Sequence, residues 1–271
     1  MTESQPSPVL FDIGVNLYSK QFNNQIDALL QRALEAGVES MIAIASDVSE
    51  SVLLHQSAPI DVPKIWTTSG VHPHQANTFD ENSVEILRRC LSDPRCVAVG
   101  ECGLDYNRMF STKAEQKHAF NQQITLAIDL NKPLYLHQRD AHSDFLETLK
   151  SHFKNGSVPG VVHCFTENRT TLRAYLDMGL YIGITGWVCD ERRGMDLRDA
   201  LSFIPQDRIL LETDAPYLKP RGYSGPYKTK RNEPCLLPFI AKYVARELAV
   251  APSTLIQHAT ANAHHLFQTK L

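Results

Sequence analysis

Short apolar runs alternate along the chain with longer stretches in which apolar residues recur about every three or four positions. Runs of the first kind are typical of strands buried on both faces of a parallel sheet, and stretches of the second kind predict amphipathic helices. The runs occupy residues 9–15, 40–45, 65–71, 97–106, 133–140, 160–165, 180–186 and 209–217. The helical stretches occupy residues 23–36, 49–58, 83–91, 112–130, 144–153, 169–178, 196–203, 236–248 and 253–267.

This order of elements predicts an α/β fold in which eight parallel strands close into a (β/α)8 TIM barrel. An open doubly wound sheet is the alternative. Such a sheet usually carries a Gly-x-Gly-x-x-Gly phosphate loop after its first strand, and the chain has none. We expect residues 1–271 to form a single domain with an extra helix at the C-terminus, because no linker interrupts the pattern. The polar residues 1–8 are expected to be flexible.

In four of these stretches the apolar residues give way to a side chain that can bind a metal ion. We place Glu101, His137, His163 and Asp214 at the ends of the fourth, fifth, sixth and eighth strands. The carboxyl ends of barrel strands converge on one face, where barrel enzymes carry their active sites. One histidine alone would more often be a hydrogen-bonded residue at a strand end. Four such residues at equivalent positions predict a site for a divalent cation.

Two further histidines, His72 and His74, follow the third run and therefore face the same mouth. A histidine in this position can donate a hydrogen bond to a phosphate oxygen or to a hydroxide nucleophile. The alternative is a loop stiffened by Pro73 whose histidines are solvated. We expect His72 to contact the substrate, and both alternatives stay open for His74.

The composition is that of a soluble globular protein, with 43% hydrophobic and 21% charged residues. A formal net charge of −3 excludes a uniformly basic coat for nucleic acid, but it allows an enzyme with a local basic patch. The six cysteines form no Cys-x-x-Cys pair, which favours reduced thiols in a cytoplasmic protein. Cys102 and Cys164 each follow a predicted ligand, so strand alternation should point them away from the metal. We expect a monomer without a membrane segment, because no apolar run approaches the roughly 20 residues that span a bilayer.

Residues 219–231 (KPRGYSGPYKTKR) contain the chain's one cluster of basic side chains. The cluster follows the strand-eight ligand, so it should lie at the rim of the mouth, with its tyrosines available to stack on bases. A solvated loop is the alternative. Trp187, after the seventh run, is a second candidate for stacking, although ordinary barrel packing explains it equally well. The expected substrate contacts in the cluster are Arg221, Lys228, Lys230 and Arg231.

Ordered motifs run through nearly the whole chain, from about residue 9 to the last helix. They are GVHPH at 70–74, GECGLD at 100–105, His137, VHCF at 162–165, GITGWVCDERRG at 183–194, ETDAP at 212–216 and RNEP at 231–234. In these motifs the chain resembles the TatD family of metal-dependent deoxyribonucleases, which have an amidohydrolase-type barrel. The resemblance implies a 3′-to-5′ exonuclease that acts on the ends of single-stranded DNA or RNA, with a place in DNA repair. It also implies that Asp214 is the general base and that Glu101 is a catalytic metal ligand.

The first strand departs from the pattern of most relatives of this barrel. Where they carry a His-x-His pair after an aspartate, this chain has Gly14 and Asn16 after Asp12. Without those two nitrogens the ligand set shifts toward oxygen, which favours Mg²⁺, or Mn²⁺, over a tightly held Zn²⁺. If the loss instead abolished metal binding, the enzyme would be inactive.

Three functions therefore compete. The first is a metal-dependent phosphodiesterase that acts on nucleic acid. The second is an ester or amide hydrolase, such as a deacylase of aminoacyl-tRNA, because the same barrel supports amide chemistry. The third is a binding protein without catalysis. A nuclease assay with and without Mg²⁺ and EDTA would separate them.

Overall fold

The apolar runs form one parallel sheet in a computed structural model that describes residues 9–57, 60–154 and 156–269. The predicted flexible residues 1–8 lie outside this part. Each strand pairs with the next one in sequence. The strands are β1 (Leu10–Val15), β2 (Val38–Ala43), β3 (Lys64–Ser69), β4 (Cys96–Asp105), β5 (Leu134–Arg139), β6 (Gly160–Val162), β7 (Tyr181–Ile184) and β8 (Ile209–Leu211).

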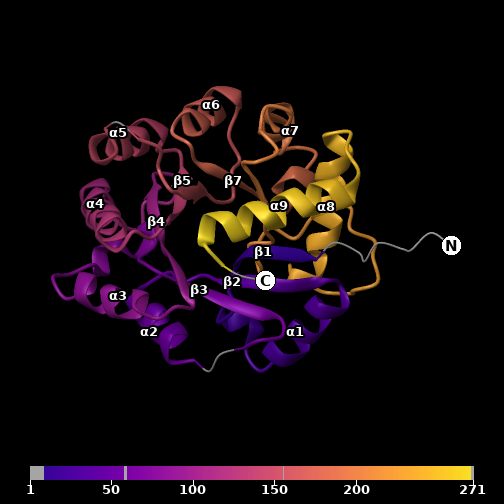
Figure 1. Ribbon diagram of the computed structural model, residues 1–271, viewed down its shortest axis with the longest axis horizontal. Helices are drawn as coiled ribbons and strands as arrows, with labels where there is room; N and C mark the ends of the chain where they lie inside the picture. The colour runs from indigo at the N-terminus through magenta and orange to yellow at the C-terminus, as the bar shows by residue number, and fades with distance from the viewer. Residues whose placement is uncertain (1–8, 58–59, 155, 270–271) are drawn as a thin grey trace.

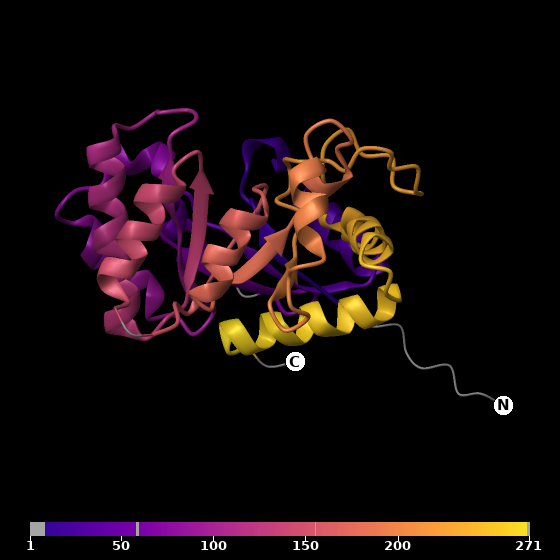
Figure 2. The ribbon, with the colours of Figure 1, turned by 90° about the horizontal axis from the view of Figure 1, so that it is seen from above.

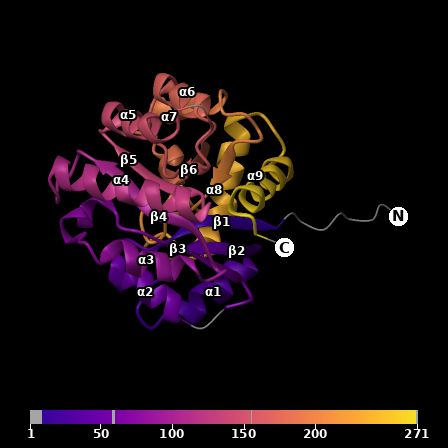
Figure 3. The same cartoon turned by 60° about the vertical axis from the view of Figure 1, so that its left-hand side comes forward.

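A helix follows each strand, and the helices surround the strands as an outer layer (Figures 1 and 3). The α-helices are α1 (Ile26–Glu35), α2 (Val48–Gln56), α3 (Ser83–Leu91), α4 (Lys113–Leu130), α5 (His142–His152), α6 (Arg169–Asp177), α7 (Met195–Leu201), α8 (Leu237–Glu247) and α9 (Pro252–Phe267). Short 3₁₀ helices are η1 (Lys20–Phe22), η2 (Pro73–Thr78), η3 (Gly186–Cys189) and η4 (Pro234–Leu236).

The sheet closes between its first strand and the residues that follow its last one. Val15 forms a parallel bridge with Ala215. The Asn16 N–H donates to the Ala215 carbonyl at 2.8 Å, and the Asp214 N–H donates to the Gly14 carbonyl at 2.9 Å. The predicted (β/α)8 barrel is therefore confirmed, and the open sheet is excluded.

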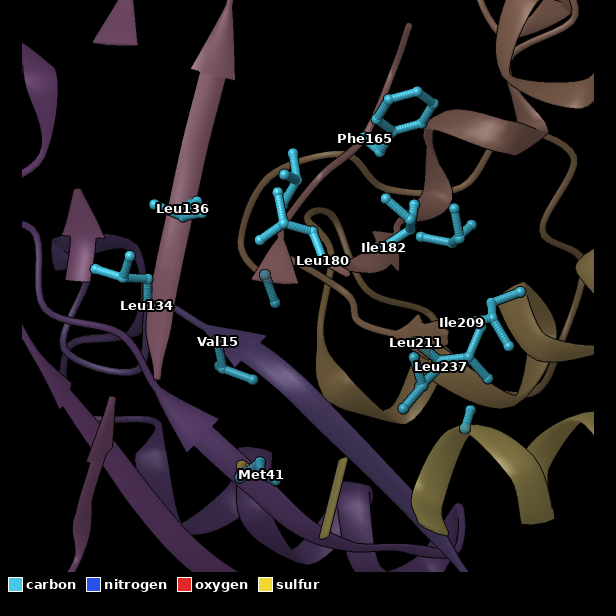
Figure 4. Close-up of a cluster of buried hydrophobic side chains, with 14 of the residues drawn as sticks. Val15, Met41, Leu134, Leu136, Phe165, Leu180, Ile182, Ile209, Leu211 and Leu237 are labelled. Atoms are coloured by element: carbon cyan, nitrogen blue, oxygen red, sulfur yellow. The ribbon is translucent and has the colours of Figure 1, made fainter. Parts of the chain in front are cut away.

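Side chains alternate between the inside of the barrel and the helix layer, as strand geometry requires. In β5, Leu134 and Leu136 belong to the outer apolar cluster, while Tyr135 between them belongs to the inner one. In β8, Ile209 and Leu211 point outward, and Figure 4 shows them beside Leu237 of α8. Each such side chain contributes about 1.5–3 kcal/mol on burial. The outer cluster thus holds the helices that support the loops of the site.

The last helix closes the amino-terminal end of the barrel. Ala263, Leu266 and Phe267 of α9 join the inner apolar cluster, and the Asn262 amide donates to the Ile209 carbonyl at 2.9 Å. In Figure 2, α9 lies along one end of the molecule and the strand arrows point away from it. This is the predicted extra C-terminal helix, and it leaves the carboxyl end of the barrel as the open end.

Two predicted strand ends are wrong, because pairing continues past them. Glu101 lies within β4 and His137 lies within β5. At Gly100 and Gly103 φ is positive, and an added Cβ would lie 2.3 Å from the Tyr135 carbonyl oxygen and 1.9 Å from that of His137. The two glycines therefore let β4 approach β5 closely and continue, with a register shift between Gly100 and Cys102.

Candidate active site

Three imidazoles surround one carboxylate oxygen at the open end of the barrel. Glu101 Oε1 lies 2.7 Å from His163 Nε2, 2.9 Å from His137 Nδ1 and 3.2 Å from His72 Nε2. Glu101 is only 5% exposed. Ligand atoms of His72, Glu101 and His137 lie within 4.8 Å of one another, as a shared metal ion requires. The structure thus brings together three of the four predicted ligands and adds His72.

The charges at this centre stabilise one another. Burial would raise the pKa of Glu101, but the charge of His163 and hydrogen bonds from His137 and His163 hold it well below its ordinary value. Burial would likewise lower the pKa of His163, but Glu101 and Glu212 hold it well above its ordinary value. A metal ion binds only the deprotonated imidazole, so a divalent cation bound here would displace the proton of His163 and take over its positive charge beside Glu101.

Two further carboxylates orient the rings. His163 Nδ1 lies 3.4 Å from Glu212 Oε2, and His137 Nε2 lies 3.3 Å from Asp105 Oδ2. Each ring is therefore held on one nitrogen and turns its other nitrogen toward Glu101, as in carboxylate–histidine–metal arrangements. Both carboxylates stand inside motifs noted in the sequence, GECGLD and ETDAP, but nothing in their spacing indicated this role.

His72 differs from the other two histidines in its protonation. Its Nδ1 accepts the backbone N–H of His74 at 2.9 Å, and burial lowers its pKa to about 4. The ring is therefore neutral, and its proton resides on Nε2, the nitrogen that faces Glu101. This arrangement makes His72 a hydrogen-bond donor in the metal-free site, although its ring is also close enough to share a metal ion with Glu101 and His137. Contact between His72 and the substrate stays a prediction.

Asp214, the fourth predicted ligand, lines the same cavity. Asn16 donates from its amide to Asp214 Oδ1 at 3.0 Å, and burial is the main cause that raises the Asp214 pKa to about 7. Asn16 therefore does more than replace a histidine, because it holds this carboxylate. At Gly14 an added Cβ would lie 2.4 Å from Tyr135 Oη and 2.6 Å from Glu212 Oε2, so a histidine has no room there.

The site opens into a cavity of about 800 Å³. Trp187 lines it, as the stacking prediction requires, together with two unpredicted cations, Arg108 and Arg139. Cys164 also lines the cavity, and its Sγ lies 3.9 Å from Thr185 Oγ1; that its side chain points away from the metal stays a prediction. Its φ of +47° breaks the strand alternation directly after β6. Cys102 is buried in the outer apolar cluster, as predicted.

The predicted cations of residues 219–231 do not line this cavity. Arg221 pairs with Asp190 at 3.0 Å, and Arg231 donates to the Gln25 side chain at 2.7 Å. Lys228 and Lys230 are exposed. Contact between these four side chains and a substrate stays a prediction.

The fold and the site together define a TIM-barrel hydrolase with a candidate metal centre at the carboxyl ends of its strands. The model of a family described as "TatD related DNase" matches residues 11–268. The chain belongs to this family.

Individual relatives cover nearly the whole chain. The 3′-5′ ssDNA/RNA exonuclease TatD of Cronobacter sakazakii is 48% identical over 95% of this chain and 97% of its own length. The protein of the same name from Edwardsiella piscicida is 47% identical over 96% of this chain and 99% of its own. The crystal structure of a TatD homologue from Escherichia coli is 26% identical, with a TM-score of 0.83, over 96% of this chain and 98% of that chain.

Proposed function

We propose that this protein is a metal-dependent phosphodiesterase that removes nucleotides from the 3′ ends of single-stranded DNA or RNA. The observation that carries the proposal is the buried Glu101 with its three imidazoles beside a cavity of about 800 Å³, which is large enough for a nucleotide. Relatives named 3′-5′ ssDNA/RNA exonuclease, identical at 47–48% of positions, support the reaction and its polarity.

Glu101, His137, His163 and Asp214 would hold the metal, and we propose Mg²⁺ or Mn²⁺. When bound, such an ion polarises the phosphate and lowers the pKa of a water molecule. The chain's own groups supply the remaining chemistry. Asp214 lines the cavity, and its carboxylate can accept a proton from the attacking water. The Nε2–H of His72 can move from Glu101 to a phosphate oxygen of the substrate.

The test uses single strands labelled at the 3′ or the 5′ end, with Mg²⁺, with Mn²⁺ and with EDTA. We expect the 3′ label to be released first as mononucleotides, and EDTA to stop the release. The variant Glu101→Gln should still fold, as followed by circular dichroism, and lose activity by orders of magnitude. Release of amino acids from aminoacyl-tRNA, with every strand left intact, would instead indicate the deacylase. Strand binding without hydrolysis of any substrate would indicate the non-catalytic binder.

We also propose a reducing, cytoplasmic location, because all six cysteines are free thiols. Within the described residues, the structure has no helix that combines the length and the apolarity needed to cross a membrane. The monomeric state stays a prediction that sedimentation equilibrium would test.

A further inference from the structure

The segment that leaves β4, residues 107–110, presents large apolar side chains to solvent at the lip of the cavity. Phe110 is 61% exposed and Met109 is 42% exposed. The Phe110 ring meets the ring of His74 in a T-shaped arrangement, with centroids 4.9 Å apart, and His74 lines the cavity. One exposed aromatic residue needs no explanation by itself. Its placement beside the candidate metal centre prompts the question of how firmly it is held.

Buried polar groups fix both ends of this segment. Asp105 Oδ1 accepts the backbone N–H groups of Asn107 and Arg108, each at 2.9 Å. The buried Gln116 amide donates to the carbonyl of Asp105 at 2.9 Å and to that of Ser111 at 3.0 Å. Phe110 is therefore presented to solvent by an ordered loop, and an ordered aromatic platform loses little entropy when it binds a flat ligand.

Two guanidinium groups lie beside this platform. Arg108 and Arg139 both line the cavity, and β4 and β5 pair at Asp105 and Arg139. Across the described ranges, neither guanidinium has a hydrogen-bond or ion-pair partner in the protein. By contrast, Arg221 outside the cavity is already neutralised by Asp190. Unpaired guanidiniums inside an otherwise acidic mouth suit phosphate oxygens, which they can bind in a bidentate manner.

We propose that Arg108, Phe110 and Arg139 form a nucleotide-binding subsite for single-stranded nucleic acid. Phe110 stacks on one base of the strand, and the two guanidiniums pair with the phosphates next to it. This inference rests on the proposed exonuclease function. It places the main substrate contacts on the loop after β4 and at the end of β5, whereas the sequence indicated residues 219–231.

The test compares Phe110→Ala and the double variant Arg108→Ala/Arg139→Ala with matched controls remote from the cavity. Phe203→Ala removes a similarly exposed phenylalanine (52%), and Arg246→Ala removes an exposed arginine of α8. Three kinds of substrate are used: short single strands, a series of the same strands in which each member carries one abasic site at a different position, and bis-p-nitrophenyl phosphate. KM and kcat are measured on the metal-loaded enzyme at low and moderate salt.

We expect Phe110→Ala to raise KM for strands about fivefold to a hundredfold, the range for one lost base stack. The loss on bis-p-nitrophenyl phosphate should be at least several times smaller. For one member of the abasic series, the one that lacks the base stacked on Phe110, KM should be the same for Phe110→Ala and for the wild type. The arginine variant should lower the salt slope by roughly 0.7 for each lost phosphate contact.

Equal behaviour of Phe110→Ala and Phe203→Ala on every strand would overturn the subsite, and so would equal losses on strands and on bis-p-nitrophenyl phosphate. Failure of the underlying function looks different. A wild-type enzyme that hydrolyses bis-p-nitrophenyl phosphate but degrades no strand would refute the exonuclease activity, and the subsite with it.

Discussion

Three histidines face Glu101, and their orientation depends on the groups that hold their other ring nitrogens: two carboxylates and one backbone N–H. The sequence identified Glu101, His137 and His163 because each ends an apolar run and carries metal-binding chemistry. It did not identify Glu212 or Asp105 as orienting groups, because that role depends on which way each imidazole is turned. Ring orientation follows from three-dimensional packing and leaves no trace in residue spacing.

The contact between Glu212 and His163 leads to a prediction about metal affinity. Glu212→Gln keeps the size of the side chain but weakens the interaction with His163 Nδ1, now at 3.4 Å. We expect about 10- to 100-fold weaker binding of Mn²⁺, as is typical when an outer partner of a ligand is lost. Titration followed by the paramagnetic signal of Mn²⁺ would measure it. Glu167→Gln, which changes a cavity carboxylate without a histidine contact, is the control. Equal affinities of the two variants would contradict the orienting role.

The first strand explains why part of the fold could be predicted and part of the site could not. Its apolar pattern predicted β1 nearly to the residue, since buried parallel strands read as continuous apolar runs. The same sequence indicated only that Gly14 has no side chain with which to bind a metal ion. The reason for glycine there lies on other elements, because the Tyr135 hydroxyl donates to Glu212 Oε2 at 2.8 Å and the pair occupies the space. The continuation of β4 past Glu101 was missed for a similar reason, because the glycines of β4 allow an approach that only β5 defines.

Adding one methyl group to β1 tests this packing. Gly14→Ala would place a Cβ against the Tyr135 hydroxyl and Glu212, and overpacking of this kind costs about 1–3 kcal/mol. We expect a matching fall in the free energy of unfolding, measured with urea at fixed pH. Gly156→Ala is the control, because an added Cβ there meets nothing within 4 Å. An unchanged Gly14→Ala protein would mean that the space is not filled as described.

The contact between Asp12 of β1 and Thr213, which follows β8, leads to a prediction about how the free energy of unfolding depends on pH. Asp12 accepts hydrogen bonds from the Thr213 N–H at 2.9 Å and the Thr213 hydroxyl at 2.6 Å, yet burial raises its pKa from 3.8 to about 7. Because the folded state holds the proton more tightly, the stabilisation is complete below pH 4 and is lost as pH rises through 7. Relative to Asp12→Asn, the metal-free wild type should lose up to about 1.4 kcal/mol per pH unit across this window. Urea unfolding of both proteins at several pH values would measure the difference, and parallel curves would contradict it.

Across the whole molecule, the regular alternation of strands and helices made the barrel predictable, since eight such units leave few ways to bury their apolar faces. The proposed substrate surface was less predictable. The basic cluster at 219–231 stood out by composition, whereas Arg108 and Arg139 are isolated in sequence and line one cavity only in the folded barrel.

The ligand set leads to a prediction about metal removal for the intact enzyme. With Gly14 in β1 and Asn16 directly after it, the centre lacks the two histidines that most relatives of this barrel carry there, so its metal should exchange readily. Dialysis against EDTA should abolish activity, and millimolar Mg²⁺ or Mn²⁺ should restore it, as followed by nucleotide release. A stoichiometric Zn²⁺ that survives dialysis and is needed for activity would contradict this expectation.

The helix α9 closes the amino-terminal end of the barrel, because its Leu266 and Phe267 pack into the inner apolar cluster. The site opens at the opposite, carboxyl end. Within the described residues, packed side chains fill the barrel between α9 and the site. We therefore expect the cleaved nucleotide to leave through the same open end by which the strand enters. If the next strand end can move in only after that nucleotide has left, the rate of digestion depends on product release as well as on hydrolysis.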